Sequence, residues 1–527
     1  MPIKILVVTA EAFPLAKTGG LGDAVSGLVL ALRKSGQDVT LMLPAYRGVA
    51  GQLSNVRAIG ELARLPGGPA TLLQGHSTAL GVSVLLLKND ALFDRDGLYQ
   101  DGDGNEYADN AVRFAALSHA AARVASGATV AQPPEIVHAH DWHTALVPML
   151  LRARGITRVK SVLTLHNLAF QGVCPMELAP QLGIPADSCS DGEFWGRLNF
   201  LKLGLRHADR ITVVSGTYAS EILTPRFGCG LQGVLLERRS DLVAIPNGID
   251  TDLWNPAQDR LLARPGFDAA DLGNKALFKR DLQRAFGLNP DAGATVMAMG
   301  SRLTHQKMAD VAADAIAAAL DAHPTLQAAV IGRGDKALEE RLAQMARLYP
   351  GRCSVRIGFD EASSHLLHAG ADLLLHGSRF EPFGLTPLYA MRYGTVPIGS
   401  RVGGMVDTIL DPGPAGDTRA MRQARGILFD GDTAADMTAA IDRAMALRRD
   451  SLLWRAMQRN GMTARFGWEP IVPQYVRLFA DLLPARARVA GRPAAAPSPK
   501  RRPAAALQGA RAALREAEPT IDRGYAV

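Results

Sequence analysis

The fold of this chain is decided by the stretch Lys17-Thr18-Gly19-Gly20-Leu21-Gly22-Asp23, which joins two segments of different periodicity. An apolar run at residues 3–10 precedes it, and an amphipathic pattern at residues 24–34 follows it. This order predicts a strand, a glycine-rich loop and a helix. Glycines let the backbone approach a ligand closely, and the first turn of a helix offers unpaired N–H groups to an anion. Taken alone, the stretch fits an ordinary strand-to-helix turn equally well.

Two later loops share this arrangement. Residues 301–307, Ser-Arg-Leu-Thr-His-Gln-Lys, follow one apolar run, and residues 378–386, Ser-Arg-Phe-Glu-Pro-Phe-Gly-Leu-Thr, follow another. Three polar loops placed after three predicted strands make an ordinary turn a poor account of all of them. Together they indicate a ligand site at the carboxyl ends of parallel strands.

The composition predicts a globular protein with two large domains. Its 527 residues exceed what one core usually organises, and 47% hydrophobic with 21% charged residues is a typical globular balance. The formal net charge is +7, but nine basic and three acidic residues lie at 485–527. The body is therefore nearly neutral, which gives no reason to expect nucleic-acid binding.

Signals for membranes and disulfides are weak in this sequence. The N-terminal apolar run is too short for a membrane span and lacks a secretory pattern. No Cys-x-x-Cys pair occurs, so we expect buried thiols in a reducing compartment rather than disulfides or structural zinc. The cysteines concerned are Cys174, Cys189, Cys229 and Cys353. We expect a cytoplasmic protein without membrane contact. The sequence pattern does not reveal the oligomeric state.

Alternating apolar and helical segments predict an α/β protein of two doubly wound, Rossmann-like domains that face a cleft. Continuous apolar strands between helices favour a parallel sheet covered on both faces. We expect an N-terminal domain at 1–245, a C-terminal domain at 246–455, a helical segment at 456–484 that packs back across the junction, and a disordered basic tail at 485–527. The predicted strands include 82–87, 135–139, 159–165, 211–214, 242–245, 295–300, 326–331, 354–357, 372–376 and 396–399, and the predicted helices include 107–126, 144–154, 193–207, 309–322 and the pattern near 454–483.

Arg302 and Lys307 are five residues apart at a predicted strand-to-helix turn. Both can point at one diphosphate, the Arg through a forked contact and the Lys as a point charge. Such neutralisation favours a leaving group that must accept negative charge. Surface charges on a loop are the competing interpretation of this pair alone, but Lys17 in the first loop adds a third cation.

Glu381 precedes Pro382, so its backbone is expected to be extended and outside a helix. A helix then begins at residues 384–386, where N–H groups form another anion site. A carboxylate so close to a phosphate is costly without a partner, and sugar hydroxyls or developing positive charge would supply one. The alternative is that Glu381 simply caps the helix.

The stretch Val137-His138-Ala139-His140-Asp141-Trp142-His143 contains a His-x-His spacing. Because no further ligands are evident, we favour a polar strand end entering the cleft over a metal site. His166-Asn167 ends another predicted strand, and a buried structural histidine is its competing interpretation.

These motifs together resemble those of bacterial glycogen synthases, the retaining glucosyltransferases that share a family with plant starch synthases. The resemblance covers about residues 3–483 and leaves out the tail. It implies the two-domain GT-B fold, ADP-glucose as donor, transfer of glucose to the non-reducing end of an α-1,4-glucan with release of ADP, and neither metal nor cofactor. The stretches that carry it are 17–23, 138–143, 166–167, 247–248, 301–307, 379–386 and 401–404.

The resemblance also implies roles for individual residues. Glu381, His166, Asp141, Lys17, Arg302 and Lys307 match catalytic positions, with Glu381 near the glucosyl ring and the three cations at the diphosphate. The implied donor-binding residues are Lys17, Gly19, Gly20, Asp23, Asn247, Arg302, Lys307, Phe359, Phe383, Gly384, Leu385 and Thr386, with Phe359 packing on adenine. Tyr99 and Asp141 are implied on the acceptor side.

This sequence departs from the family pattern at two positions and from a wider class of transferases at a third. Phe383 replaces a frequent cysteine, and Met308 replaces the glycine that usually follows the motif lysine. Tyr389 stands where a wider class of retaining transferases repeats a Glu, which matches the synthase family and not that class. The first two departures affect the expected donor affinity and pocket shape.

Three other functions are compatible with parts of the pattern. One is an ADP-glucose transferase that forms maltose 1-phosphate from glucose 1-phosphate. Another is a pyridoxal-phosphate-dependent phosphorylase. The third is a non-catalytic protein that binds glucan or nucleotide, against which the intact Lys17, Arg302, Lys307 and Glu381 argue.

Overall fold

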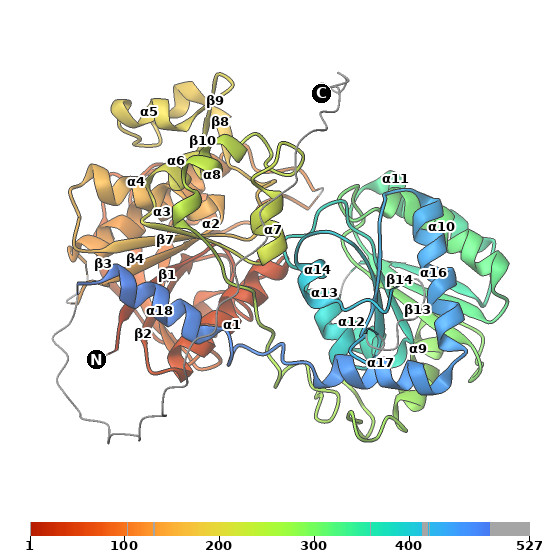
Figure 1. Ribbon diagram of the computed structural model, residues 1–527. Coiled ribbons are helices and arrows are strands. Elements are labelled where there is room, and N and C mark those ends of the chain that lie inside the picture. The colour runs from red at the N-terminus through yellow and green to blue at the C-terminus, as the bar shows by residue number, and fades with distance from the viewer. Residues whose placement is uncertain are drawn as a thin grey trace, which may run out of the picture. The chain divides into compact units, whose positions relative to one another are not determined.

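The computed structural model describes residues 2–102, 104–129, 132–358, 360–413, 420 and 422–484 (Figure 1). Contacts divide the chain into one unit at Met1–Leu483 and a second at Pro484–Val527. All but one residue of the second unit, and with it the predicted tail, lie outside the described residues. None of the helices described combines the length and apolar character that crossing a membrane requires.

The N-terminal lobe, β1 to β12, is built on a nine-stranded sheet in the order β12-β11-β7-β6-β1-β2-β5-β4-β3. The central strands are buried runs of branched apolar residues in parallel register, as in the pairing of β1 with β2 and β6. The prediction of a wholly parallel sheet is wrong at one edge, because β3, β4 and β5 pair antiparallel. The strands are β1 Lys4–Val8, β2 Asp38–Pro44, β3 Ser54–Leu62, β4 Ala70–Ser77, β5 Val82–Lys88, β6 Ile136–His140, β7 Lys160–Leu165, β11 Arg210–Val213 and β12 Leu242–Ala244.

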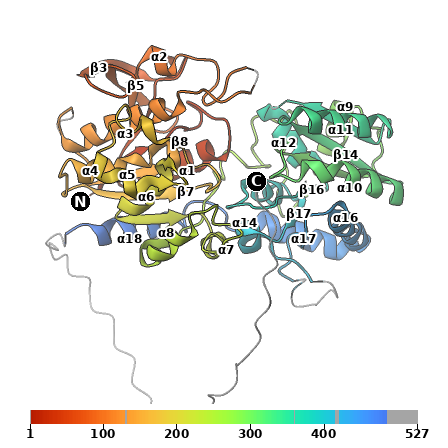
Figure 2. The same ribbon diagram turned by 90° about the horizontal axis from the view of Figure 1, so that it is seen from above.

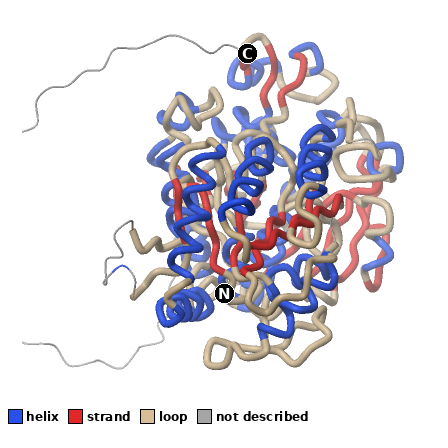
Figure 3. Tube along the Cα trace, turned by 90° about the vertical axis from the view of Figure 1, so that its right-hand side faces the viewer, coloured by secondary structure: helices blue, strands red, loops and turns tan. Residues whose placement is uncertain are grey.

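Helices flank these strands, and Figure 3 shows them packed along the sheets. Helix α1 follows β1 and the glycine-rich loop, in the predicted order, but it begins at Gly20, four residues before the predicted start. It buries the face that includes Val25, Leu28 and Leu32 against the sheet. The helices of this lobe are α1 Gly20–Lys34, α2 Asp90–Phe93, α3 Asn110–Ser126, α4 Leu146–Ala153, α5 Ala186–Gly192, α6 Phe200–His207, α7 Gly216–Glu221 and α8 Gln232–Glu237.

A helix over 193–207 was expected and is only half correct. Helix α6 occupies its second part, whereas the first part forms a hairpin of β9 (Glu193–Phe194) and β10 (Arg197–Asn199). Trp195 and Gly196 both have positive φ, 51° and 79°, and this left-handed backbone reverses the chain. The hairpin completes a small sheet, β8-β10-β9, with β8 at Val173–Pro175.

The C-terminal lobe, α9 to α17, contains a six-stranded parallel sheet in the order β15-β14-β13-β16-β17-β18. The predictions for 295–300 and 309–322 match β13 and α10 residue for residue. The strands are β13 Thr295–Gly300, β14 Leu326–Gly332, β15 Cys353–Ile357, β16 Leu373–His376, β17 Val396–Ser400 and β18 Ile427–Phe429. The helices are α9 Lys275–Phe286, α10 Ala309–Ala322, α11 Lys336–Arg347, α12 Glu361–Gly370, α13 Leu385–Arg392, α14 Gly403–Thr408, α16 Ala434–Arg448 and α17 Ser451–Thr463.

The last helix returns to the N-terminal lobe. Helix α18 (Val472–Leu482) follows α17 in the chain, yet its Tyr475 and Phe479 belong to the core of the first sheet. Both rings lie 5.5 Å from the ring of His138 on β6. Figures 1 and 2 show α18 beside the N-terminal elements. The stretch expected to be helical near 454–483 is therefore two helices that serve different lobes.

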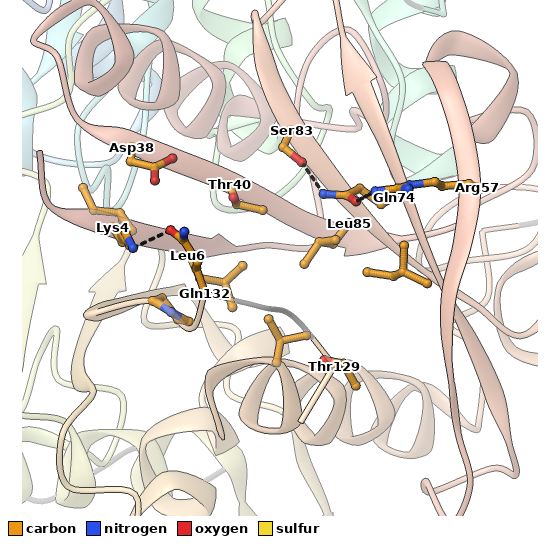
Figure 4. A pocket seen from close by; sticks show the side chains of 14 residues that line it. Lys4, Leu6, Asp38, Thr40, Arg57, Gln74, Ser83, Leu85, Thr129 and Gln132 are labelled. Carbon is orange, nitrogen blue, oxygen red and sulfur yellow. Dashed lines mark hydrogen bonds between the residues drawn. The ribbon is translucent and has the colours of Figure 1, made fainter. Parts of the chain in front are cut away.

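A cavity of about 450 Å³ opens on the face of β1, β2, β5, β4 and β3 (Figure 4). Its polar lining includes Lys4, Asp38 and Ser83, which lie at or near the amino-terminal ends of their strands. The three loops singled out in the sequence follow the carboxyl ends of strands. This cavity is therefore separate from the predicted site.

Candidate active site

The predicted loops lie at the expected edges of both sheets. Strands β7, β6 and β1 are parallel neighbours, so the glycine-rich loop, Asp141 and His166 follow adjacent strand ends. In the second sheet β13 and β16 are neighbours, which brings Arg302, Lys307 and Glu381 together in the same way. The predicted placement of these loops at carboxyl strand ends is confirmed, and the ligand site itself stays a prediction.

The glycine-rich loop is held by Glu11, a buried carboxylate that the sequence analysis missed. Its Oε2 accepts the N–H groups of Thr18 and Gly19 at 2.8 and 3.1 Å, and its Oε1 accepts the hydroxyls of Thr18 and Tyr99 at 3.0 and 2.7 Å. The expectation of unpaired amides is therefore wrong for these two, because a carboxylate of the protein already occupies them. A Cβ added to Gly20, the first residue of α1, would lie 3.4 Å from Cδ1 of Leu385 in the other lobe.

Lys17 links the two lobes through an ion cluster. Its Nζ lies 2.9 Å from Oδ2 of Asp23 and 3.6 Å from Oε2 of Glu361 on α12, and its side chain is 19% exposed. Burial raises the pKa of Asp23, and the charge of Lys17 opposes that rise. The hydroxyl of Tyr389 on α13 also reaches Asp23, at 3.5 Å. Lys17 is thus a partnered cation at the predicted diphosphate position.

Lys307 and Glu381 form an ion pair across the two C-terminal loops, with side chains that are 12% and 10% exposed. His376, at the end of β16, lies with Nε2 3.2 Å from the same carboxylate oxygen, Oε2 of Glu381. Burial alone would raise the pKa of Glu381, but the charge of Lys307 and the hydrogen bond from His376 hold it well below the usual range. Glu381 does not cap α13, whose N-cap is Gly384. The partner expected for this carboxylate is therefore a lysine of the protein.

Arg302 differs from Lys307 in being exposed. Its guanidinium has a long hydrogen bond to Gln306, at 3.4 Å, and lies 6.0 Å from the ring of Phe170 in the N-terminal lobe. Among the three cations of the site, Arg302 is the one with no ion pair in the described residues. It can accept an anion without giving up a strong partner.

The two departures from the family pattern are buried residues. Met308 has φ 54°, a left-handed conformation that glycine adopts most readily, and its side chain is fully buried. The glycine usual at this position in the family would suit this backbone, and in this chain a methionine adopts the same conformation. Phe383 is buried in a core cluster beneath α14, so it adds bulk behind the loop.

Asp141 organises the loop that follows β7. Its Oδ1 accepts the N–H groups of His166 and Asn167, at 2.6 and 3.3 Å. Burial raises the pKa of Asp141 to about 7 even though these bonds favour the charged form. Asp141 itself has φ 55°, another left-handed position. The carboxylate therefore fixes the backbone that carries His166.

The histidines on β6 are buried, which corrects the expectation that they enter the cleft. His138 and His140 are both fully buried, and Nε2 of His138 bonds Oγ1 of Thr164 at 2.6 Å. His140 Nδ1 lies 2.9 Å from Nε2 of His166, which is half-buried. Burial lowers the pKa of His166 and His138 to about 3, so these rings are neutral. No group of metal-ligating side chains is found in the described part of the chain.

The remaining predicted residues are placed as follows. Asn247 is buried in the segment after β12, and Leu385 and Thr386 begin α13, half-buried. Tyr99 stacks on His143 with ring centroids 4.7 Å apart and donates its hydroxyl to Glu11. Its acceptor role stays a prediction. Phe359 lies outside the described residues.

Comparisons with known proteins agree with this arrangement. Residues 4–237 match the family described as starch synthase catalytic domain, and residues 282–461 match glycosyl transferases group 1. A glycogen synthase of Bordetella petrii is 56% identical over 513 residues, 97% of each chain. One of Ralstonia nicotianae is 52% identical over 485 residues, 92% of this chain and 89% of the other.

The chain belongs to the glycogen synthase family.

Solved structures place the glycogen synthase fold of this chain among GT-B glycosyltransferases. The catalytic domain of starch synthase IV from Arabidopsis thaliana, bound to ADP and acarbose, matches with a TM-score of 0.82 and 27% identity over 92% of this chain and 99% of that one. A sucrose-phosphate synthase of Thermosynechococcus elongatus shares the fold, with a TM-score of 0.56 and 18% identity over 91% and 99%. As a member of this family, the chain is a glycosyltransferase.

Proposed function

We propose that the chain transfers glucose from ADP-glucose to the non-reducing end of an α-1,4-glucan, with retention, and releases ADP. The observation that carries this proposal is the cluster of Arg302, Lys307 and Glu381 at the strand ends of one lobe, with Lys17 at the strand ends of the other. The starch synthase neighbour, whose structure holds ADP and acarbose, supports a nucleotide donor and a glucan acceptor.

The cations act on the leaving group. When the bond between glucose and diphosphate breaks, negative charge develops on the diphosphate oxygens, and fixed positive charges stabilise it. Lys307 is already held in place by Glu381, so little reorganisation is needed at the moment of reaction. Arg302 is exposed and supplies a forked contact at the entrance.

Glu381 acts on the sugar. Its carboxylate stays ionised because Lys307 and His376 hold its pKa low, so it cannot serve as a general acid at neutral pH. A permanently charged carboxylate orients ring hydroxyls and stabilises positive charge that develops at the anomeric carbon. The acceptor hydroxyl approaches from the face that the diphosphate leaves, and the leaving oxygen takes its proton.

The strand ends of the N-terminal lobe position the sugar hydroxyls, which carry no charge. His166 is uncharged and half-buried, and Asp141 fixes its backbone, so this edge offers hydrogen bonds rather than charge. Sugar hydroxyls are suited to such an edge. Tyr99 acts here through Glu11 and the glycine-rich loop, as a positioning residue.

Binding the donor requires Lys17 to exchange partners. Its Nζ is held by Asp23 and Glu361, which come from different lobes. A diphosphate that takes up Lys17 replaces these contacts, and closure of the lobes around it would exclude water and limit donor hydrolysis. We infer that protein cations supply all of the required charge, so EDTA should leave the rate unchanged.

One assay tests the proposal. Initial rates of nucleoside diphosphate release are measured with ADP-glucose and with UDP-glucose, each with glycogen, with glucose 1-phosphate and with no acceptor. We expect glycogen-dependent release of ADP, slower release of UDP, and labelled glucose in the polymer. Release that does not depend on glycogen, or exclusive use of glucose 1-phosphate as acceptor, would contradict it.

A further inference from the structure

Two adjacent aromatic rings, an exposed Trp195 and a half-buried Phe194, lie at the tip of the small sheet, outside the site described above. Trp195 is 78% exposed, and its ring lies 4.2 Å from that of Phe194 at 38°. We call Phe194 and Trp195 the aromatic tip. Figure 1 shows the strands that carry it, β8, β9 and β10, beside α5. Nothing in the catalytic proposal uses these rings.

The backbone of this turn is unusual for the residue it carries. Both central residues of the turn have positive φ, which hairpins normally provide with Asn-Gly. A tryptophan in the left-handed region is an outlier, because its bulky side chain disfavours that conformation. Asparagine would satisfy the turn better and expose no ring. The ring is therefore present despite the local backbone preference.

The aromatic tip packs against Gly230, and hydrogen bonds support the turn that carries it. Gly230, with φ 81°, lies beneath both rings, and a Cβ there would stand 2.7 Å from Trp195 and 2.8 Å from Phe194. The N–H of Gly196 donates to Oε1 of Glu193 at 2.7 Å, and Lys202 donates to the carbonyl of Glu193. A ring fixed in advance loses little conformational freedom when a ligand stacks on it.

The tip is connected to the acceptor side of the active site. Its strand β10 pairs with β8, which follows the loop that carries His166. Gln171 joins these parts, because it accepts from Asn199 at 2.6 Å and donates to the carbonyl of Cys229 at 2.9 Å. The neighbouring Phe170 is 43% exposed and faces Arg302. Phe170 is three residues from Val173, which pairs with Asn199, and Asn199 is four residues from Trp195, so the two Cα atoms are at most about 30 Å apart.

The surroundings of the rings select the kind of ligand. Glu193 and Arg197, both exposed, flank the rings with opposite charges, which disfavours an anionic membrane surface or a polyanion. A glucose unit presents C–H groups on its faces, which stack on an aromatic ring, and hydroxyls at its rim, which hydrogen-bond to charged neighbours. A glucan chain is both suited to this surface and, under the proposed function, present at the adjacent loop.

We propose that the aromatic tip is a second glucan-binding site, where Phe194 and Trp195 hold an α-glucan chain outside the active site. This inference rests on the proposed function for the identity of the ligand. Its consequence is a distinction between acceptors: a long or branched glucan reaches both sites, whereas maltotriose reaches only the active site. The tip raises the local concentration of chain ends without touching the reacting atoms.

The test replaces Trp195 with asparagine. Trp195→Asn removes the ring and creates the Asn-Gly turn that this backbone favours, so the hairpin is retained. The matched control is Leu452→Asn, which removes an apolar side chain that is 81% exposed on α17 in the other lobe. Melting temperatures of both variants confirm folding, and each is assayed with glycogen, with maltotriose, and by electrophoresis in a gel that contains glycogen.

We expect Trp195→Asn to raise the KM for glycogen by about five- to tenfold, the loss expected for one stacked ring, and to abolish retardation in the gel. Its kcat and KM with maltotriose and the properties of Leu452→Asn should equal those of the wild type. If Trp195→Asn were retarded in the gel like the wild type and had the same KM for glycogen, the proposal would be overturned. The aromatic tip would then be a candidate contact surface for another protein. Equal losses on both acceptors would also overturn it. Failure of the proposed function is separate, since wild-type enzyme would then release no ADP with either acceptor.

Discussion

The strand ends of the two lobes are built from different chemistry. In the N-terminal lobe, neutral histidines stand beside two buried carboxylates, Asp141 and Glu11, that accept backbone amides. In the C-terminal lobe, Lys307 and Glu381 form a largely buried ion pair, and an exposed Arg302 stands beside it. Both sets follow the carboxyl ends of parallel strands, so the fold does not cause the difference.

This difference indicates that the two lobes have different tasks in the reaction. Neutral, hydrogen-bonding groups suit sugar hydroxyls, which gain no charge during transfer. Charged groups suit the diphosphate and the anomeric carbon, where charge develops. Lys17 is the exception, a cation in the N-terminal lobe that is held across the lobes by Glu361. Lys17 therefore adds a positive charge from the N-terminal lobe to the charged groups of the C-terminal lobe.

We expect the strongest loss of activity from a substitution among the charged residues of the C-terminal lobe. Glu381→Gln removes the charge that stabilises positive character at the sugar and leaves Lys307 without its counter-charge. We expect kcat to fall by about 10²–10³-fold or more, with a lower melting temperature from the unpaired, largely buried cation. Steady-state rates and thermal unfolding measure both.

The control for this variant is Asp310→Asn, which removes a carboxylate paired with Arg379 near the same loop. We expect its kcat to stay close to wild type, because that pair is structural. If Glu381→Gln turned over as fast as this control, the role of Glu381 would be refuted.

Removing the cations should have the next largest effect. We expect Arg302→Ala and Lys307→Ala each to lower kcat by about 10²-fold, because each removes charge from the departing diphosphate. Lys336→Ala, which removes an 80% exposed lysine on α11, is the control. Unchanged turnover in both site variants would remove the argument from charge stabilisation.

A third prediction concerns the cost of burying the Asp141 carboxylate in the N-terminal lobe. Folding raises the pKa of Asp141 from 3.8 to about 7, so its contribution to stability is fully present below about pH 4 and is lost as the pH rises through 7. The loss is at most about 4 kcal/mol. Asp141→Asn should therefore melt above the wild type at pH 8, by a margin that shrinks towards pH 5.

The matched control is Asp252→Asn, because the Asp252 side chain is 86% exposed. Its melting temperature should track the wild type at every pH. A constant difference between Asp141→Asn and the wild type from pH 5 to pH 8 would contradict the buried charge.

We expect the weakest effect from a substitution that tests how Lys17 is held across the lobes. Glu361→Gln removes the partner of Lys17 in the other lobe but leaves Asp23 at 2.9 Å. Because this pair is partly exposed and 3.6 Å long, we expect the KM for the donor to fall by only about two- to threefold, with kcat unchanged. Donor titrations at low and high salt measure this, and an increase in KM would mean that Glu361 helps to hold the donor.

The sequence predicted the elements whose pattern is local. The strand at 295–300 and the helix at 309–322 show clear apolar periodicity and match β13 and α10. The helix expected at 193–207 failed in its first part, because two residues of positive φ turn the chain where the apolar spacing continues. The antiparallel edge of β3 and β4 was not predicted.

The candidate site was predicted in its loops but not in its pairings. Nothing in the sequence indicates that Glu11 would fill the amides of Thr18 and Gly19, since the partners are seven and eight residues apart along an irregular loop. The Lys307–Glu381 pair joins residues 74 positions apart and depends on the adjacency of β13 and β16. The His-x-His spacing correctly indicated a shared strand face, and burial against α18 explains why that face is closed.

The account depends on three cations from two lobes gathering on one diphosphate, and a crystal structure of the enzyme with ADP tests this most directly. We expect the diphosphate oxygens to lie within hydrogen-bonding distance of the amino groups of Lys17 and Lys307 and the guanidinium of Arg302, with Lys17 released from Glu361. ADP bound with its phosphates away from these groups, or with Lys17 still paired to Glu361, would contradict the account.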